Sequence, residues 1–326
     1  MERVATGADG GRWALAGRRA RGEDARAAGP PRRTRRSRGR CRPARGGAGS
    51  ARARPARRGA PGLDLTRYLG VDLAWGPRAR TGLAALDEHG RLVASAAVRA
   101  DDEIAAFVSE HAPGEVVAAI DAPLVVPNLT GRRRCEALVT AEFGRFHAGA
   151  YPANRSNPLF DPPRARTLAD RFGWATDPGV VPGAGTSVAI EVYPHPATIL
   201  LFGLTTVLPY KARRGRDLES RRPAFRALLD HLERVCDDPL RLSVSPRWAE
   251  LRAVVAGAVR ASELERVEDE IDAVLCAYLA WLWGERDPRM RVLGDADEGY
   301  IVVPGTVEPV SGPGVVAVPG EVPASG

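Results

Sequence analysis

The chain has 326 residues, of which 44% are hydrophobic, and it carries a formal net charge of +7. Its length and apolar content suffice for one large domain or two small ones, each with a buried core. The positive charge is concentrated in residues 1–60, where 18 arginines face four acidic residues, so residues 61–326 carry a formal charge of −7. The basic composition is therefore excluded as evidence that the folded part binds polyanions.

Residues 1–62 are predicted to be a disordered, arginine-rich leader. They are rich in Arg, Gly, Ala and Pro, and such a segment cannot bury enough apolar surface to offset the entropy of ordering. A GC-rich coding sequence gives this composition, so we expect the leader to be dispensable; the alternative is an arm that holds phosphates electrostatically. Residues 304–326, rich in Pro, Gly and Val, are expected to form a disordered tail. One domain is predicted between them, over residues 63–303.

The sequence predicts a soluble, cytoplasmic protein without a membrane span. Its longest apolar run, residues 273–283, is shorter than the about 20 residues that cross a bilayer as a helix. The four cysteines form no CxxC pair and have no histidine at zinc-ligand spacing: Cys41, Cys135, Cys236 and Cys276. We expect free thiols in a reducing compartment.

The domain opens with three strand signals separated by short turns: 68–71, 81–86 and 92–98. Gly90 precedes the third strand and can take the left-handed conformation of a bulged hairpin turn. Asp101 is expected to cap a helix that ends at Pro113. A fourth strand, 116–120, is wholly apolar, as expected for a strand covered on both faces.

Helical periodicity then recurs in five segments: 132–146, 197–203, 223–236, 247–258 and 263–283. In the first of them four side chains are expected to point inward: Cys135, Leu138, Val139 and Phe143. Residues 147–186 read as a long loop with a short helical pattern at 168–174, and loops of this length in compact domains are usually functional. A fifth strand is expected at 187–190. This order predicts an α/β fold: a five-stranded mixed sheet with helices on both faces and a helical and loop insertion before the last helix.

Three of the predicted strands are followed directly by an acidic residue: Asp72, Asp121 and Glu191. A turn or cap would explain one such acid, but three in one domain indicate that they belong to a common site. Ligands of open α/β sheets bind beyond the strand ends, where the chain order reverses. We therefore expect these carboxylates to form part of a site.

Two more acids, Asp269 and Asp272, lie near the start of the last predicted helix. Because they are three residues apart, they share a face. The rest of this helix is apolar on nearly all sides, and one side carries only small side chains. This pattern predicts that the helix is buried and packs closely against the sheet. Helix-dipole stabilisation is the alternative explanation; it accounts for the preceding glutamates better than for these two aspartates.

Converging carboxylates repel one another unless a cation neutralises them. Ligand sets made only of oxygen suit Mg²⁺ or Mn²⁺, and two such ions about 3.5–4 Å apart can activate a water and stabilise the leaving oxygen of a phosphodiester. In this hypothesis Asp72 bridges two ions, Asp121 and Asp272 each hold one, and Asp269 or Glu191 completes a shell or orients the water.

Five motifs, in this order, resemble those of the domain of unknown function 429 family: Gly70-Val71-Asp72-Leu73-Ala74, Ile120-Asp121-Ala122-Pro123-Leu124, Gly131-Arg132-Arg133-Arg134-Cys135-Glu136, Glu191-Val192-Tyr193-Pro194 and Asp269-Glu270-Ile271-Asp272-Ala273. The resemblance covers about residues 67–303 and implies a ribonuclease-H-like fold, related to Holliday-junction resolvases, with predicted nuclease activity. In the resolvase pattern an acid ends strand one, another ends strand four, and an Asp-x-x-Asp pair opens the last helix. Asp121 departs from it, because a longer glutamate is common there.

Several basic residues are candidates for substrate contacts. Arg133 and Arg134 either meet substrate phosphates or form a solvated basic turn. Lys211, the only lysine in the chain, opens a basic cluster through residue 216 that is either a phosphate-contacting loop or a surface charge run. His195, between two prolines, is either a proton shuttle or a packed loop residue.

The leading functional hypothesis is a metal-dependent nuclease whose partner is DNA or RNA. An actin-like nucleotide phosphotransferase is a second, but the glycine-rich phosphate turns it requires are missing after Asp72 and Asp121. The third is an inactive ribonuclease-H-like binding module that uses the arginine-rich leader for partners. Such a module is expected to show no stabilisation by divalent metal.

Overall fold

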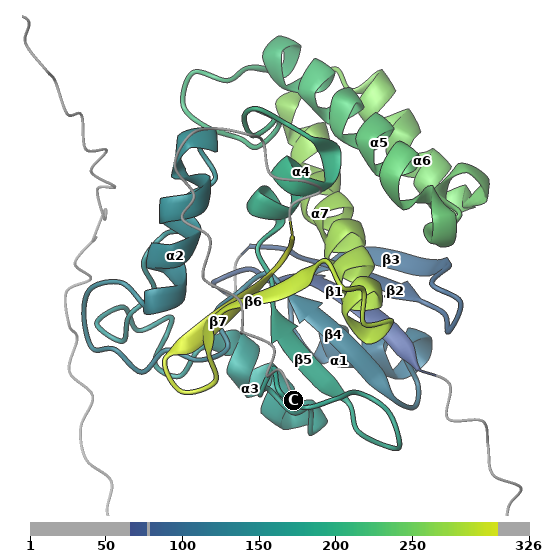
Figure 1. Cartoon of the computed structure of the whole chain (residues 1–326). Coiled ribbons are helices and arrows are strands. Elements are labelled where there is room, and N and C mark those ends of the chain that lie inside the picture. Colours follow the sequence, from purple (N-terminus) through teal and green to yellow (C-terminus); the bar gives the residue numbers. More distant parts are fainter. Residues whose placement is uncertain (1–65, 77–78, 306–326) are drawn as a thin grey trace, which may run out of the picture. The chain divides into compact units, whose positions relative to one another are not determined.

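A computed structural model describes residues 66–76 and 79–305 of the chain (Figure 1). Its centre is a sheet of five strands: β1 (Arg67–Asp72), β2 (Thr81–Leu86), β3 (Leu92–Val98), β4 (Val116–Ile120) and β5 (Val188–Glu191). The strand order is β3-β2-β1-β4-β5. The hairpin-linked strands β1, β2 and β3 pair antiparallel, whereas β1, β4 and β5 run parallel. The prediction of a five-stranded mixed sheet is confirmed.

Seven α-helices and two short 3-10 helices accompany the sheet in the described residues: α1 (Asp101–His111), α2 (Arg134–Phe143), η1 (Gly144–Phe146), α3 (Arg164–Phe172), α4 (Pro194–Phe202), α5 (Leu218–Leu240), η2 (Leu242–Val244), α6 (Pro246–Gly257) and α7 (Ala261–Gly284). Helices α4, α5 and α6 separate β5 from α7, where the sequence predicts an insertion. Asp101 is the first residue of α1 and not its cap, which is Ala100. The carboxylate of Glu103 accepts the backbone N–H groups of Arg99 and Ala100 instead.

Helix α7 lies directly on one face of the sheet (Figure 1). Two glycines make this approach possible: a Cβ atom at Gly70 would overlap the backbone of Ala273 and Ala277, and one at Gly82 would overlap the carbonyl of Asp269. The small residues predicted on one side of the last helix therefore do face the strands. As a result, the first half of α7 lies over the ends of β1 and β2.

The opposite face of the sheet carries α1 and α3 (Figure 1). Side chains alternate along a strand, so Leu69 and Leu83, next to Gly70 and Gly82, point away from α7, and both are fully buried. Helix α1 contacts β2 and β3, which α7 covers from the other side. The prediction of helices on both faces is therefore correct.

The sequence analysis misses a second, two-stranded sheet, formed by β6 (Met290–Asp295) and β7 (Gly299–Pro304). A bridge between Val192 and Val302 joins this hairpin to the end of β5, and α2 packs against it. The predicted inward face of α2 is wrong at one position. Leu138 is 38% exposed, whereas Glu136 is buried and forms an ion pair with Arg133.

Other local predictions have clear outcomes. Gly90 adopts φ +77°, and the β2–β3 register shifts between Ala85 and Leu86, which confirms the bulged hairpin. The cysteines Cys135, Cys236 and Cys276 are buried free thiols. No helix within the described ranges is both long and apolar enough to cross a membrane. The predicted leader (1–62) and the predicted tail, apart from its residues 304–305, lie outside the described residues.

Candidate functional site

Asp72 and Asp121 lie side by side at the carboxyl ends of neighbouring parallel strands. Val71 on β1 is the register partner of Ile120 on β4, and the N–H of Asp121 donates to the carbonyl of Val71 at 2.8 Å. The two acids are thus one position beyond paired residues. Gly70 faces α7, and Ala119 is its register partner on β4. Side chains two residues apart on a strand share a face, so Asp72 and Asp121 lie on the α7 side of the sheet.

The two aspartates of α7 lie on that same side. Asp272 is 1% exposed, and its Oδ1 accepts a 2.8 Å hydrogen bond from the Tyr210 hydroxyl. The Lys211 ammonium lies 2.7 Å from its Oδ2. Asp269, one turn earlier and partly exposed, has its Oδ2 3.9 Å from the Nε of Arg80. Four carboxylates from three separate elements therefore face one region at the end of the sheet.

The pKa values show that these carboxylates interact. Burial raises the pKa of Asp72 well above its ordinary range; Lys211 opposes the rise, and Asp272, Asp121 and Asp269 add to it. Burial, together with the charges of Asp272 and Glu191, raises the pKa of Asp121 to about 7, and Lys211 opposes this rise. The pKa of Asp269 rises to about 6 through burial and the charge of Asp272. Burial and, to a lesser extent, mutual repulsion thus disfavour the charged forms of these three carboxylates.

Lys211 is the cation closest to this cluster among the contacts of the described residues. Burial disfavours its charge, but Asp272 and Asp72 outweigh burial and raise the pKa of its ammonium well above the ordinary value. The sequence analysis leaves Lys211 between a phosphate-contacting loop and a surface charge run, whereas here it forms an ion pair with Asp272. Tyr210, buried beside it, is a site residue that the sequence analysis misses; its place next to the single lysine is the signal that was available.

Glu191 lies near enough to raise the pKa of Asp121, but its side chain does not point into the cluster. Its register partner is Ile120, so it is one position out of step with Asp72 and Asp121 and points to the other side of the sheet. There its carboxylate accepts hydrogen bonds from Arg133 at 2.7 and 2.9 Å and from the N–H of Leu124 at 2.9 Å. The predicted role of Glu191 in a metal shell or in orienting water does not match this placement.

The two arginines at the start of α2 differ sharply. Arg133 is 3% exposed and also binds Glu136, with its Nε 2.8 Å from Oε1, so it does not reach the surface as the predicted phosphate contact requires. Arg134 is exposed and lies 4.0 Å from Asp295 of β6, which leaves it accessible. The buried group of Arg133, Glu136 and Glu191 thus holds the loop after β4 against β5 and α2.

His195 lies in the first turn of α4, close enough for its charge to depend on the cluster. Its Nδ1 is 3.3 Å from the Tyr193 hydroxyl. Burial, together with the charge of the neighbouring Lys211, lowers the pKa of His195 to about 4, while Asp272 acts in the opposite direction. The imidazole is therefore neutral near pH 7 and is a weaker base than an ordinary histidine.

A metal ion has to be considered against the contacts that are present. As they stand, no three Asp, Glu, His or Cys side chains in residues 66–76 and 79–305 are placed so that they could hold a metal ion. Two observations nevertheless fit a hard divalent cation. The donors are all carboxylate oxygens, and the buried Oδ2 of Asp272 accepts no hydrogen bond, since its contact with Lys211 is an ion pair without hydrogen-bond geometry.

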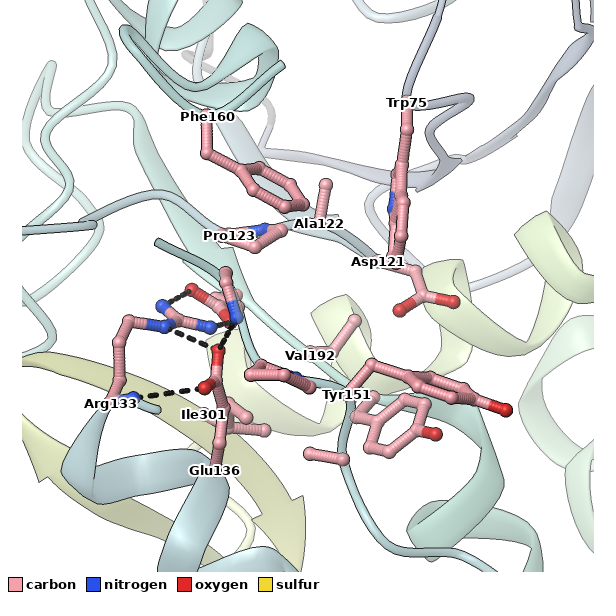
Figure 2. A pocket seen from close by; sticks show the side chains of 15 residues that line it. Trp75, Asp121, Ala122, Pro123, Arg133, Glu136, Tyr151, Phe160, Val192 and Ile301 are labelled. Carbon is pink, nitrogen blue, oxygen red and sulfur yellow. Dashed lines mark hydrogen bonds and ion pairs between the residues drawn. The ribbon is translucent and has the colours of Figure 1, made fainter. Parts of the chain in front are cut away.

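A pocket opens beside Asp121 (Figure 2). Its walls include aromatic and proline side chains, and its floor carries the charged group of Arg133, Glu136 and Glu191. Its main wall residues are Trp75, Pro123, Tyr151, Phe160 and Tyr193. None of these was singled out from the sequence as a site residue, because they come from loops and from the start of a helix, where no periodic pattern marks them.

The chain matches a known protein family. Residues 70–298 match the model of the family described as "Protein of unknown function (DUF429)". Neither the curated proteins nor the solved structures contain a significant match to the chain.

Proposed function

Because the chain belongs to the DUF429 family, whose description leaves its activity open, we propose a function from the site itself: a ribonuclease-H-like, metal-dependent nuclease that hydrolyses phosphodiester bonds in DNA or RNA. The observation that carries this proposal is the meeting of Asp72, Asp121 and Asp272. Burial and mutual repulsion raise the pKa values of the first two. A fold retains such a cluster at a cost, which a bound divalent cation would offset.

The architecture supports the same proposal. An antiparallel hairpin precedes a parallel crossover, and the order β3-β2-β1-β4-β5 brings β1 and β4 to the middle of the sheet. Asp72 ends β1 and Asp121 follows β4, and an Asp-x-x-Asp pair lies on the helix that packs across both strands. This is the arrangement that the resolvase resemblance implies for Asp72, Asp121, Asp269 and Asp272.

Each residue of the cluster has a proposed role. Asp72, Asp121 and Asp272 would hold Mg²⁺ or Mn²⁺, in two positions that share Asp72, and Asp269 would complete the set. When bound, the ions supply charge neutralisation and an activated water. Lys211 balances the charge of Asp272 in their absence. Neutral His195, with its Nδ1 3.3 Å from the Tyr193 hydroxyl, would add no charge beside the cluster.

The backbone hydrogen bonds do not favour the alternative function, an actin-like nucleotide phosphotransferase. That function needs free N–H groups after the first and fourth strands to hold phosphates. After β1 the N–H of Ala74 donates to Thr81 Oγ1 at 3.2 Å, and after β4 the N–H of Leu124 donates to Glu191. Both donors are thus used within the protein.

The proposal is tested by a cleavage assay on the full chain. Labelled single-stranded, duplex and branched DNA and RNA are incubated with Mg²⁺ or Mn²⁺, and in parallel with EDTA. We expect cleavage only with metal, and a loss of at least about 100-fold in Asp72→Asn and Asp272→Asn, because each removes a charge on which several kcal/mol of transition-state stabilisation depend. Asp297→Asn, at an exposed acid on the β6–β7 turn, serves as the matched control. Cleavage that persists in EDTA, or in both site variants, contradicts the proposal.

A further inference from the structure

Two exposed aromatic side chains stand at the pocket beside Asp121 (Figure 2). Trp75 is 48% exposed and Tyr151 is 63% exposed, and they are the two aromatic residues among the exposed large hydrophobic side chains of the described chain. Large aromatic side chains are usually buried to a high degree. Two of them left open on one pocket indicate a surface that binds flat, apolar groups.

Both rings are held by neighbours. Trp75 packs edge-on against Phe160, with ring centroids 5.4 Å apart and planes at 69°. The hydroxyl of Tyr151 accepts a 3.4 Å hydrogen bond from Arg213. The pocket walls are therefore positioned before any ligand arrives, which lowers the entropic cost of binding.

Positive charge borders the same pocket. Arg213, which contacts Tyr151, belongs to the basic loop 211–216, whose first residue, Lys211, forms the ion pair with Asp272 of the carboxylate cluster. Arg213 and Arg214 are exposed. A ligand that places a flat ring between Trp75 and Tyr151 would bring any attached phosphate next to these guanidinium groups, which suit phosphate oxygens.

The polar groups on the floor of the pocket are already hydrogen-bonded, so they offer little to distinguish one nucleobase from another. Arg133 donates hydrogen bonds to both Glu136 and Glu191, and each carboxylate also accepts from backbone N–H groups; Figure 2 shows Arg133 beside Glu136. Stacking on aromatic walls accepts every nucleobase, because each base has a π face. The pocket is thus suited to bases in general.

We propose that this pocket binds one unpaired base of a single-stranded nucleic acid, stacked against Trp75 and Tyr151, while the arginines of loop 211–216 contact the phosphates. The inference rests on the proposed function, since it names the substrate class of that site. In a duplex both faces of a base are covered by the neighbouring bases, so stacking on these side chains should favour unpaired strands over duplex.

The test measures binding in EDTA, where cleavage does not interfere. Fluorescence anisotropy is recorded with short labelled single strands of DNA and of RNA, with an abasic strand of equal length and charge, and with a duplex. We expect the wild-type chain to bind a base-bearing strand at least about fivefold more tightly than the abasic strand. Trp75→Ala and Tyr151→Ala should each reduce this preference severalfold or remove it, and Trp75→Phe should retain it. Val244→Ala, at an exposed apolar residue of η2, is the control that should change nothing.

The outcomes separate this inference from the nuclease proposal. Tighter binding of the base-bearing DNA or RNA strand than of the abasic strand supports the inference. Whichever of the two binds more tightly identifies the preferred sugar. Equal binding of base-bearing and abasic strands, or a preference for duplex, overturns it, even if metal-dependent cleavage is found. Conversely, a base preference that Trp75→Ala removes supports the pocket even if no metal brings about cleavage.

Discussion

Replacing Arg133 with methionine is expected to lower the free energy of unfolding by about 3–5 kcal/mol, because it leaves the buried carboxylates of Glu191 and Glu136 without their cation. Arg133 is 3% exposed, and its guanidinium binds both acids and the carbonyl of Val125. The measurement is equilibrium unfolding in guanidinium chloride.

Arg134 gives this prediction a matched control. It is the next residue in the chain, its side chain is 71% exposed, and its ion partner Asp295 is 4.0 Å away, so Arg134→Ala should change stability by less than about 0.5 kcal/mol. The double variant Arg133→Met with Glu191→Gln should recover part of the loss. If Arg133→Met and Arg134→Ala are equally stable, the buried pair does not hold the loop after β4 as described.

Asp121→Asn is expected to be more stable than the wild-type chain at pH 8 without divalent metal, by about 2–4 kcal/mol. Burial, with Asp272, raises the pKa of Asp121 to about 7 in the folded protein, whereas the unfolded chain has an ordinary value of about 3.9. Between these values the folded state binds more protons than the unfolded state. Wild-type stability therefore falls as pH rises from about 4 to about 7, and the variant, which cannot titrate there, escapes this loss.

The difference between the two proteins should shrink as pH falls and vanish near pH 4. Thermal melting in EDTA across this pH range measures it, with Asp297→Asn as the control, because that exposed acid should show no such trend. Adding Mg²⁺ or Mn²⁺ at pH 8 should raise the melting temperature of the wild-type chain and not that of Asp121→Asn. If the wild-type chain is as stable as the variant in EDTA at pH 8, the ionised carboxylate of Asp121 does not destabilise the folded protein, and the prediction is wrong.

The sequence predicts the central sheet well because its signals are local and strong. Wholly apolar β4 and the turn at Gly90 follow from strand and hairpin chemistry that needs no tertiary information. The hairpin of β6 and β7 is missed because every residue of β6 is only partly buried and gives no alternating pattern. Its position is set by packing against α2 and by the bridge from Val192.

The candidate site is predictable only in part, for reasons of geometry. Asp72, Asp121 and Asp272 follow from strand ends and helix spacing. Glu191 follows the same rule, but the register of β5 against β4 turns it to the other face, and register is not visible in the sequence. Tyr151 lies in a loop, and its position depends on contacts such as that with Arg213.

The central claim is that carboxylates distant in sequence meet closely enough to bind divalent cations. Crystals soaked in Mn²⁺ and measured for anomalous scattering test it most directly. We predict anomalous peaks in contact with Asp72, Asp121 and Asp272, with the ammonium of Lys211 withdrawn from Asp272. A soaked crystal in which Lys211 still contacts Asp272, and in which no peak touches any of the three aspartates, would contradict the account.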